Sequence, residues 1–181
     1  YGARHDMLAE GTLDPLEARA VVLAFEQGKL AIVGIDLGRA PTFRSMERIR
    51  AAVREQAQVD HVMICGSHTH HGPVVELLDE PGKGQGKFDA AVAYVGEMET
   101  GIIAAIVEAA EKAVPAKIGW NGIEIPLNRN RQSKREPKPR DPELGLIRLD
   151  TLEGKPIAVI VNFAAHPVIH DIRDLRWTWE W

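Results

Sequence analysis

Residues 18–37 read ARAVVLAFEQGKLAIVGIDL, two short runs of apolar and β-branched residues separated by a polar segment. Ala18 to Phe25 and Leu30 to Leu37 each have the length and composition of a strand. The segment Glu26-Gln27-Gly28-Lys29 between them is typical of a hairpin turn. This stretch therefore predicts two paired strands, and the chain around it alternates between strands and helices.

Helical spacing occurs twice after this hairpin. From Pro41 to Ala57, apolar residues fall three or four positions apart among charged residues, and a proline suits the first turn of a helix. A longer helix is predicted from Phe88 to Val114, because apolar residues again repeat at helical spacing and Pro115 ends the pattern. Further strands are predicted at Val59 to Cys65, Lys117 to Ile125, Gly145 to Leu149 and Ile157 to Ala164.

The order of these elements predicts an α/β fold in which helices flank a mixed β-sheet, as part of a larger layered domain. The chain has 181 residues, of which 45% are hydrophobic and 27% charged, enough for one domain with a sizeable core. We find no internal repeat and no break between two domains. Tyr1 at the start and the aromatic ending WTWEW indicate a fragment that is truncated at both ends.

The composition argues against several classes of protein. A formal net charge of -4 offers no basic surface for a phosphate backbone, so nucleic acid is not expected as a partner. The sequence contains no run of 18 uncharged apolar residues and no basic segment before an apolar one, so neither a membrane span nor a signal peptide is predicted. Cys65 is the only cysteine, which excludes an intrachain disulfide.

Three of the seven histidines lie within four positions, in the stretch CGSHTHHGP of residues 65–73. His68 and His70 are two positions apart, so on a strand their side chains would point to the same side. Imidazole is a common ligand of zinc, and a catalytic zinc needs three protein ligands and a position left open for water. The spacing indicates a metal site, and polar side chains with ordinary hydrogen bonds are the alternative interpretation.

A further histidine, His166, follows the strand predicted at Ile157 to Ala164 and precedes a proline. Strand ends in one sheet of an α/β domain tend to converge on one edge, so we expect His166 to meet His68 there. The other histidines lack such a context and are interpreted as ordinary surface residues. His170 is a weaker candidate for a metal ligand than His166, and His5 and His61 are not candidates.

Two polar segments are predicted as surface loops. The segment RNRQSKREPKPRD, residues 129–141, is basic and rich in proline, which is typical of a solvated excursion. The segment EPGKGQGK, residues 80–87, is rich in glycine but lacks the GxxxxGK[ST] order of a phosphate loop.

The HTHHG run also invites comparison with the HxHxDH motif of the metallo-β-lactamase fold. In that motif an aspartate in the fifth place helps to bind a second metal ion. Gly72 stands at that place here, so the metallo-β-lactamase fold is not favoured.

Several motifs together resemble a known family. The stretch GSHTHHGP, residues 66–73, is similar to the GTHTHSGP signature of the neutral/alkaline, non-lysosomal ceramidases. Three further pieces match motifs of that family in the same order: Ile35-Asp36-Leu37-Gly38, Leu127-Asn128-Arg129 and Phe163-Ala164-Ala165-His166-Pro167. The resemblance extends over essentially the whole chain and identifies residues 1–181 as a partial N-terminal catalytic domain of this kind.

The resemblance implies a zinc-dependent amidohydrolase that cuts the N-acyl bond of ceramide to give sphingosine and a fatty acid. It assigns His68 and His166 as zinc ligands, His70 as a second histidine lining the site, and Arg129 as an active-site arginine. Zinc lowers the pKa of its bound water and polarises a carbonyl, and we expect His70 to carry the proton to the leaving amine. Arg129 would fix a hydroxyl or the developing oxyanion, with a surface ion pair as the alternative.

The resemblance also implies a ceramide-like N-acyl lipid as substrate, contact with a membrane surface, and a secreted, periplasmic or cell-surface location. The family completes its zinc shell with a glutamate and a tyrosine from later in the catalytic domain, beyond these 181 residues. His71 stands where the signature usually has serine, and the sequence leaves open whether its ring crowds the site or points away.

Two other interpretations of the function stay open at this point. A zinc hydrolase of this kind could act on another amide or on an ester, and the shape of the pocket would separate these substrates from a long-chain lipid. The domain could also bind lipid or a partner without catalysis, and loss of metal binding at His68 and His166 would favour that interpretation.

Overall fold

The computed structural model of the chain describes residues 8–75, 84, 86, 88–171 and 173–180. Contacts within the chain divide it into two compact units, one formed by Tyr1–Ala113 with Pro167–Trp181 and the other by Val114–His166. The sequence does not reveal this division, because the second boundary falls inside the FAAHP motif.

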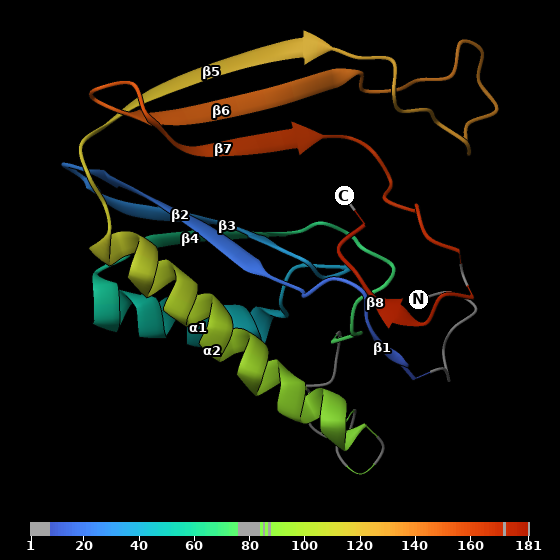
Figure 1. Ribbon diagram of the computed structural model, residues 1–181, viewed down its shortest axis with the longest axis horizontal. Coiled ribbons are helices and arrows are strands. Elements are labelled where there is room, and N and C mark those ends of the chain that lie inside the picture. The colour runs from blue at the N-terminus through green and yellow to red at the C-terminus, as the bar shows by residue number, and fades with distance from the viewer. Residues whose placement is uncertain (1–7, 76–83, 85, 87, 172, 181) are drawn as a thin grey trace. The chain divides into compact units, whose positions relative to one another are not determined.

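The first unit is built on a mixed three-stranded sheet. The strands β2 (Ala18–Phe25), β3 (Gly28–Ile35) and β4 (His61–Gly66) lie in the order β2-β3-β4. The pair β2 and β3 is antiparallel, which confirms the hairpin, whereas β3 and β4 run parallel (Figure 1). A parallel pair needs a crossover, and the helix α1 (Phe43–Ala57) supplies it.

Both predicted helices are present, with slightly shorter bounds. Helix α1 begins after Thr42, whose side chain accepts a hydrogen bond of 3.3 Å from the backbone N–H of Ser45, so Pro41 precedes the cap rather than opening the first turn. The second helix, α2, spans Asp89–Glu111. Its Glu99 accepts a hydrogen bond of 2.5 Å from the Ser45 hydroxyl and one of 2.9 Å from Nε of Arg48, which ties α2 to α1.

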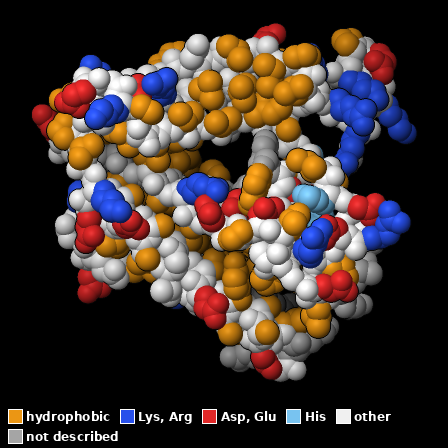
Figure 2. Space-filling view, viewed as in Figure 1, with side chains coloured by type: hydrophobic (Ala, Val, Ile, Leu, Met, Phe, Trp, Pro, Cys, Tyr) orange, Lys and Arg blue, Asp and Glu red, His pale blue; other side chains and the backbone are white. Residues whose placement is uncertain are grey.

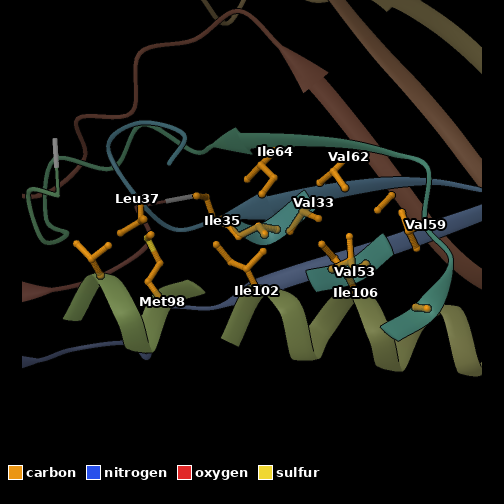
Figure 3. Packing of buried hydrophobic residues seen from close by; sticks show 14 of the residues in the cluster. Val33, Ile35, Leu37, Val53, Val59, Val62, Ile64, Met98, Ile102 and Ile106 are labelled. Carbon is orange, nitrogen blue, oxygen red and sulfur yellow. The ribbon is translucent and has the colours of Figure 1, made fainter. Parts of the chain in front are cut away.

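The core of this unit lies between the sheet and the two helices (Figure 3). Period-two alternation along β3 and β4 turns every second residue toward the helices, and helical spacing gives α1 and α2 one buried stripe each. The most completely buried apolar residues are Ala31, Val33, Ile49, Val53, Val59, Ile102 and Ile106.

Helix α2 is long and apolar enough, by length and composition alone, to cross a membrane, with a mean hydropathy of 1.5 over its most apolar window. One stripe of the helix is nevertheless buried in the core, at Val95, Met98, Ile102 and Ile106. This is the pattern of a helix that packs against a sheet, and composition alone is weak evidence for a span.

The C-terminal segment returns to the first unit. Strand β8 (Arg176–Trp177) pairs in parallel with β1 (Gly11–Thr12). The ring of Trp177 lies 6.3 Å from that of Tyr94 between centroids, so this tryptophan of the aromatic ending packs against α2.

The second unit is an antiparallel sheet of three strands, β5 (Ala116–Glu124), β6 (Glu143–Thr151) and β7 (Pro156–Phe163), in the order β5-β6-β7. Many of its apolar side chains are exposed to solvent; Trp120 is 86% exposed and Val161 is 57% exposed. Figure 2 shows hydrophobic side chains gathered over this sheet. The basic segment 129–141 connects β5 to β6, and most of its residues are exposed, as the sequence predicts.

Candidate metal site

The carboxyl ends of β3 and β4 lie at the same edge of their sheet, because the two strands are parallel. The chain leaving β4 follows the chain leaving β3: the N–H of Ser67 donates to the carbonyl of Ile35 at 2.9 Å, and that of His68 donates to Leu37 at 3.0 Å. A Cβ at Gly66 would lie 2.8 Å from the carbonyl oxygen of Leu37, so only glycine permits this approach. The IDLG and CGSHTHHGP motifs are thus neighbours in space.

His68 is held in an orientation suited to metal binding. Its Nδ1 lies 2.5 Å from the carbonyl oxygen of Gly38, and because a carbonyl only accepts, Nδ1 carries the proton. In this tautomer Nε2 carries a lone pair and no proton, which is the form in which histidines bind metals. The backbone of His68 has a φ of 67°, a left-handed conformation that residues other than glycine seldom adopt.

His70 lies beside His68. The two rings meet edge to face, with their centroids 5.1 Å apart, and each offers a ring nitrogen within 4.8 Å of the other. Both side chains are half-buried. Imidazole nitrogen binds zinc at about 2.0–2.1 Å, so His68 fits as a ligand of zinc or of another imidazole-binding metal, with a second ring nitrogen, that of His70, close by.

The side chain of His71 is buried within the protein. Its Nδ1 lies 2.9 Å from Oε1 of Glu180, and its ring meets that of His170 at 5.6 Å between centroids. The side chain of Glu180 is also buried. The histidine that replaces the serine of the signature therefore packs within the fold and joins the loop to the C-terminal segment.

The carboxylate of Glu180 accepts hydrogen bonds from this loop and from the segment after His166. Its Oε2 accepts a hydrogen bond of 2.7 Å from the backbone N–H of His70, and its Oε1 accepts one of 3.2 Å from that of His170. Burial by itself raises the pKa of Glu180, but these two N–H donors and the His71 ring outweigh it and hold the pKa below the ordinary glutamate value.

Asp36, in the IDLG motif, supports the neighbouring chain. One of its carboxylate oxygens accepts a hydrogen bond of 2.9 Å from the backbone N–H of Glu17. Burial raises the pKa of Asp36, although that hydrogen bond and the guanidinium of Arg19, at 3.8 Å, act in the opposite direction. The aspartate therefore ties the chain before β2 to the end of β3.

His166 and Arg129 belong to the second unit. His166 is exposed at the end of the chain that leaves β7. Asn128 donates a hydrogen bond of 2.7 Å to the carbonyl of Ala164 and another to that of Asp141, so the LNR motif holds the FAAHP motif. Exposed Arg129 lines an open pocket of about 450 Å³ together with Ala164.

The structure thus brings His68 and His70 together in one loop, as the sequence predicts. The expectation that His166 follows a strand of the same sheet is wrong, because β7 pairs with β6 in an antiparallel sheet separate from that of β3 and β4 among the described residues. His61 is exposed, His170 lies against His71, and His5 and most of residues 80–87 lie outside the described residues.

Sequence reasoning missed two residues that hold these loops. Asn128 lies in the LNR motif, but only its neighbour Arg129 was predicted to have a role in the site. Glu180 belongs to no recognised motif, and its neighbours in WTWEW stand out in the sequence only as aromatic residues.

No protein-family model matches the sequence. Among solved structures, the chain resembles one described as neutral ceramidase from Pseudomonas aeruginosa, with a TM-score of 0.69 and 18% identity over 90% of this chain and 28% of that one. It also resembles a structure described as ceramidase complexed with C2, with a TM-score of 0.61 and 20% identity over 83% of this chain and 26% of that one.

The fold and the paired histidines define an α/β domain with a candidate metal site at the end of a parallel strand pair. More particularly, the fold is similar to that of part of a neutral ceramidase, so the fold expected from the motif resemblance is confirmed. The chain spans about a quarter of the length of these neighbours.

Proposed function

We propose that this chain contributes the histidine ligands of a zinc-dependent amidohydrolase that cleaves the N-acyl bond of ceramide or a closely similar lipid. The single observation that carries the proposal is the pairing of His68 and His70 on a ceramidase-like fold, with the proton of His68 placed on Nδ1 by the Gly38 carbonyl. A metal site of this type would take an imidazole-binding ion such as zinc.

His68 and His166 are proposed as the zinc ligands. His68 presents Nε2, and His166 directly precedes Pro167, the residue at which the chain re-enters the first unit. Three residues further on, the N–H of Ile169 donates to Glu180, which also accepts from His70. The chain that follows His166 is therefore tied to the loop that carries His68.

His70 and Arg129 are proposed to act on the substrate. A bound zinc would supply an activated water and polarise the acyl carbonyl. The imidazole of His70, whose ring lies beside that of His68, would take a proton from the attacking water and pass it to the leaving amine. The guanidinium of Arg129, which is exposed in an open pocket, would donate to a substrate hydroxyl or to the oxyanion.

An N-acyl lipid is the proposed substrate. One structural neighbour is described as a ceramidase and the other as a neutral ceramidase, which supports ceramide over other amides. A lipid substrate would also bring the protein to a membrane surface, and a secreted or cell-surface location would suit that contact.

The test is hydrolysis by the full-length protein that carries this chain. Ceramide labelled on its acyl chain would be offered beside an ester of the same acid and an N-acyl amino acid of the same chain length. We expect release of the fatty acid from ceramide, and a loss of turnover in Arg129→Ala with zinc content unchanged. Arg131→Ala, in the same exposed loop, is the matched control.

Three results would count against the proposal in different ways. Cleavage of the ester or of the amino acid amide alone would contradict the substrate but keep the hydrolase. Zinc binding without cleavage of any of the three would contradict catalysis. Equal turnover in the Arg129 and Arg131 variants would contradict the role of Arg129.

A further inference from the structure

Glu180 makes an unusual set of contacts for a buried carboxylate. Its side chain is fully buried, and it meets two separate loops. Oε2 accepts from the backbone N–H of His70 at 2.7 Å, whereas Oε1 accepts from those of Ile169 and His170 at 3.3 and 3.2 Å. One oxygen thus binds the loop after β4, and the other binds the segment that follows His166.

The contacts around Glu180 extend this connection. The hydroxyl of Thr69 donates to the carbonyl of Thr178 at 2.7 Å, and the N–H of Thr178 donates to the carbonyl of His71 at 3.1 Å. Thr69 and Thr178 are both buried. The segment Thr178–Glu180 therefore lies along the histidine loop, and the Glu180 carboxylate makes the last hydrogen bond between them.

A purely structural role does not explain why a carboxylate stands at this place. Removing a carboxylate from water is unfavourable unless its oxygens are hydrogen-bonded, and an apolar residue here would leave three backbone N–H groups without this acceptor, those of His70, Ile169 and His170. Glu180 also has a φ of 57°, a left-handed backbone conformation that is unfavourable for its side chain. What a carboxylate uniquely offers is two acceptor oxygens a fixed distance apart, each able to receive N–H groups from a different loop.

We propose that Glu180 is a positioning residue that sets the spacing between the loop carrying His68 and His70 and the chain segment that leaves His166. We call the contacts of Glu180 with these two segments the clamp. This inference rests on the proposed function, because the clamp matters for activity only if the histidines bind a metal. Glu180 does not itself touch the ion. It fixes the backbone from which ligands on both sides extend, as outer hydrogen-bond partners do in metal sites.

The variant Glu180→Gln tests this role, because it keeps the shape of the side chain but replaces one acceptor oxygen by a donor group. That group would face N–H donors, so one of the two loops is released. We expect hydrogen exchange in the metal-free protein to speed up at least tenfold at the amides of His70 and His170, with the amide of Val33 unchanged. Zinc affinity, measured against a chelating dye, should fall by about 10–100-fold.

Asp14→Ala is the matched control. Asp14 accepts a hydrogen bond of 2.6 Å from the Thr178 hydroxyl, so it anchors the same C-terminal segment without touching either loop of the clamp. We expect this variant to keep zinc affinity within about twofold of the wild type. If Glu180→Gln does not fold, Glu180→Asp serves instead, since it keeps the charge but is one methylene too short to hold both loops.

The outcomes separate this proposal from the proposed function. Faster exchange at His70 and His170 in a protein that binds no zinc would support the clamp and contradict the metal site. Unchanged exchange at these amides would overturn the clamp, whatever the metal does. Equal losses of zinc affinity in the Glu180 and Asp14 variants would show a general structural effect and would overturn the positioning role.

Discussion

Strands β4 and β7 follow the same sequence pattern, an apolar run that leads to a histidine and then a proline, yet they belong to different kinds of sheet. Strand β4 is parallel to β3 and packs on two helices, whereas β7 is an antiparallel strand whose apolar side chains are largely open. The comparison teaches that a local motif can predict a histidine after the end of a strand without predicting the sheet to which that strand belongs.

The largest expected effect concerns the histidines at the two strand ends. His68→Ala and His166→Ala should each weaken zinc binding by more than the roughly 10–100-fold caused by loss of an outer partner, because each removes a proposed ligand. His61→Ala, on the exposed start of β4, is the control and should bind zinc like the wild type. Competition with a chelating dye measures all three. Equal affinities in the three variants would contradict the assignment.

Most of the first unit could be predicted from the sequence, because its signals are local. The hairpin follows from two apolar runs around Gly28, and α1 and α2 follow from apolar spacing bounded by Pro41 and Pro115. The pairing of β7 could not be predicted in this way, since a short apolar run fits either a parallel or an antiparallel sheet.

The candidate site could be predicted to a similar extent. His68 and His70 are recognisable from their spacing and motif, and His166 from its place before a proline. Glu180 was not, because its role depends on contacts with residues about 10 and 110 positions away along the chain. Such contacts leave no periodic pattern in one sequence.

The next effect compares burial on the two strands. Val62→Ala on β4 and Val161→Ala on β7 remove the same two carbons from side chains that are 7% and 57% exposed. We expect Val62→Ala to lower the free energy of unfolding of the 181-residue chain by about 1.5–3 kcal/mol, and Val161→Ala by less than about 1 kcal/mol. Urea denaturation followed by circular dichroism measures both. A similar loss in the two variants would mean that β7 is as buried as β4.

The close approach at the end of β4 gives a third test. A Cβ added at Gly66 would lie 2.8 Å from backbone atoms of Leu37 and Arg39, whereas one at Gly119 on β5 meets nothing within 4 Å. Gly66→Ala should therefore destabilise the chain by about 1–3 kcal/mol, and Gly119→Ala should not destabilise it. Thermal unfolding of the two variants decides the matter, and a stable Gly66→Ala variant would show that the two motifs are not in contact.

The smallest expected effect is the pH dependence that comes from Asp36. Because burial raises its pKa in the folded protein, the folded state binds this proton more readily than the unfolded chain does. Its contribution to stability is therefore fully present below the ordinary aspartate pKa and is lost as the pH rises through the raised value. Asp36→Asn removes this titration. The difference between wild-type and variant unfolding free energies should change across mildly acidic pH, and a constant difference would contradict a raised pKa.

The central claim is that histidines from the two strand ends bind one zinc ion. The most direct measurement is the zinc content, by elemental analysis, of the full-length protein that carries this chain and of its His68→Ala/His166→Ala double variant. The account predicts about one zinc per chain in the wild type and almost none in the variant. A wild-type protein without zinc, or a double variant that keeps its zinc, would contradict it.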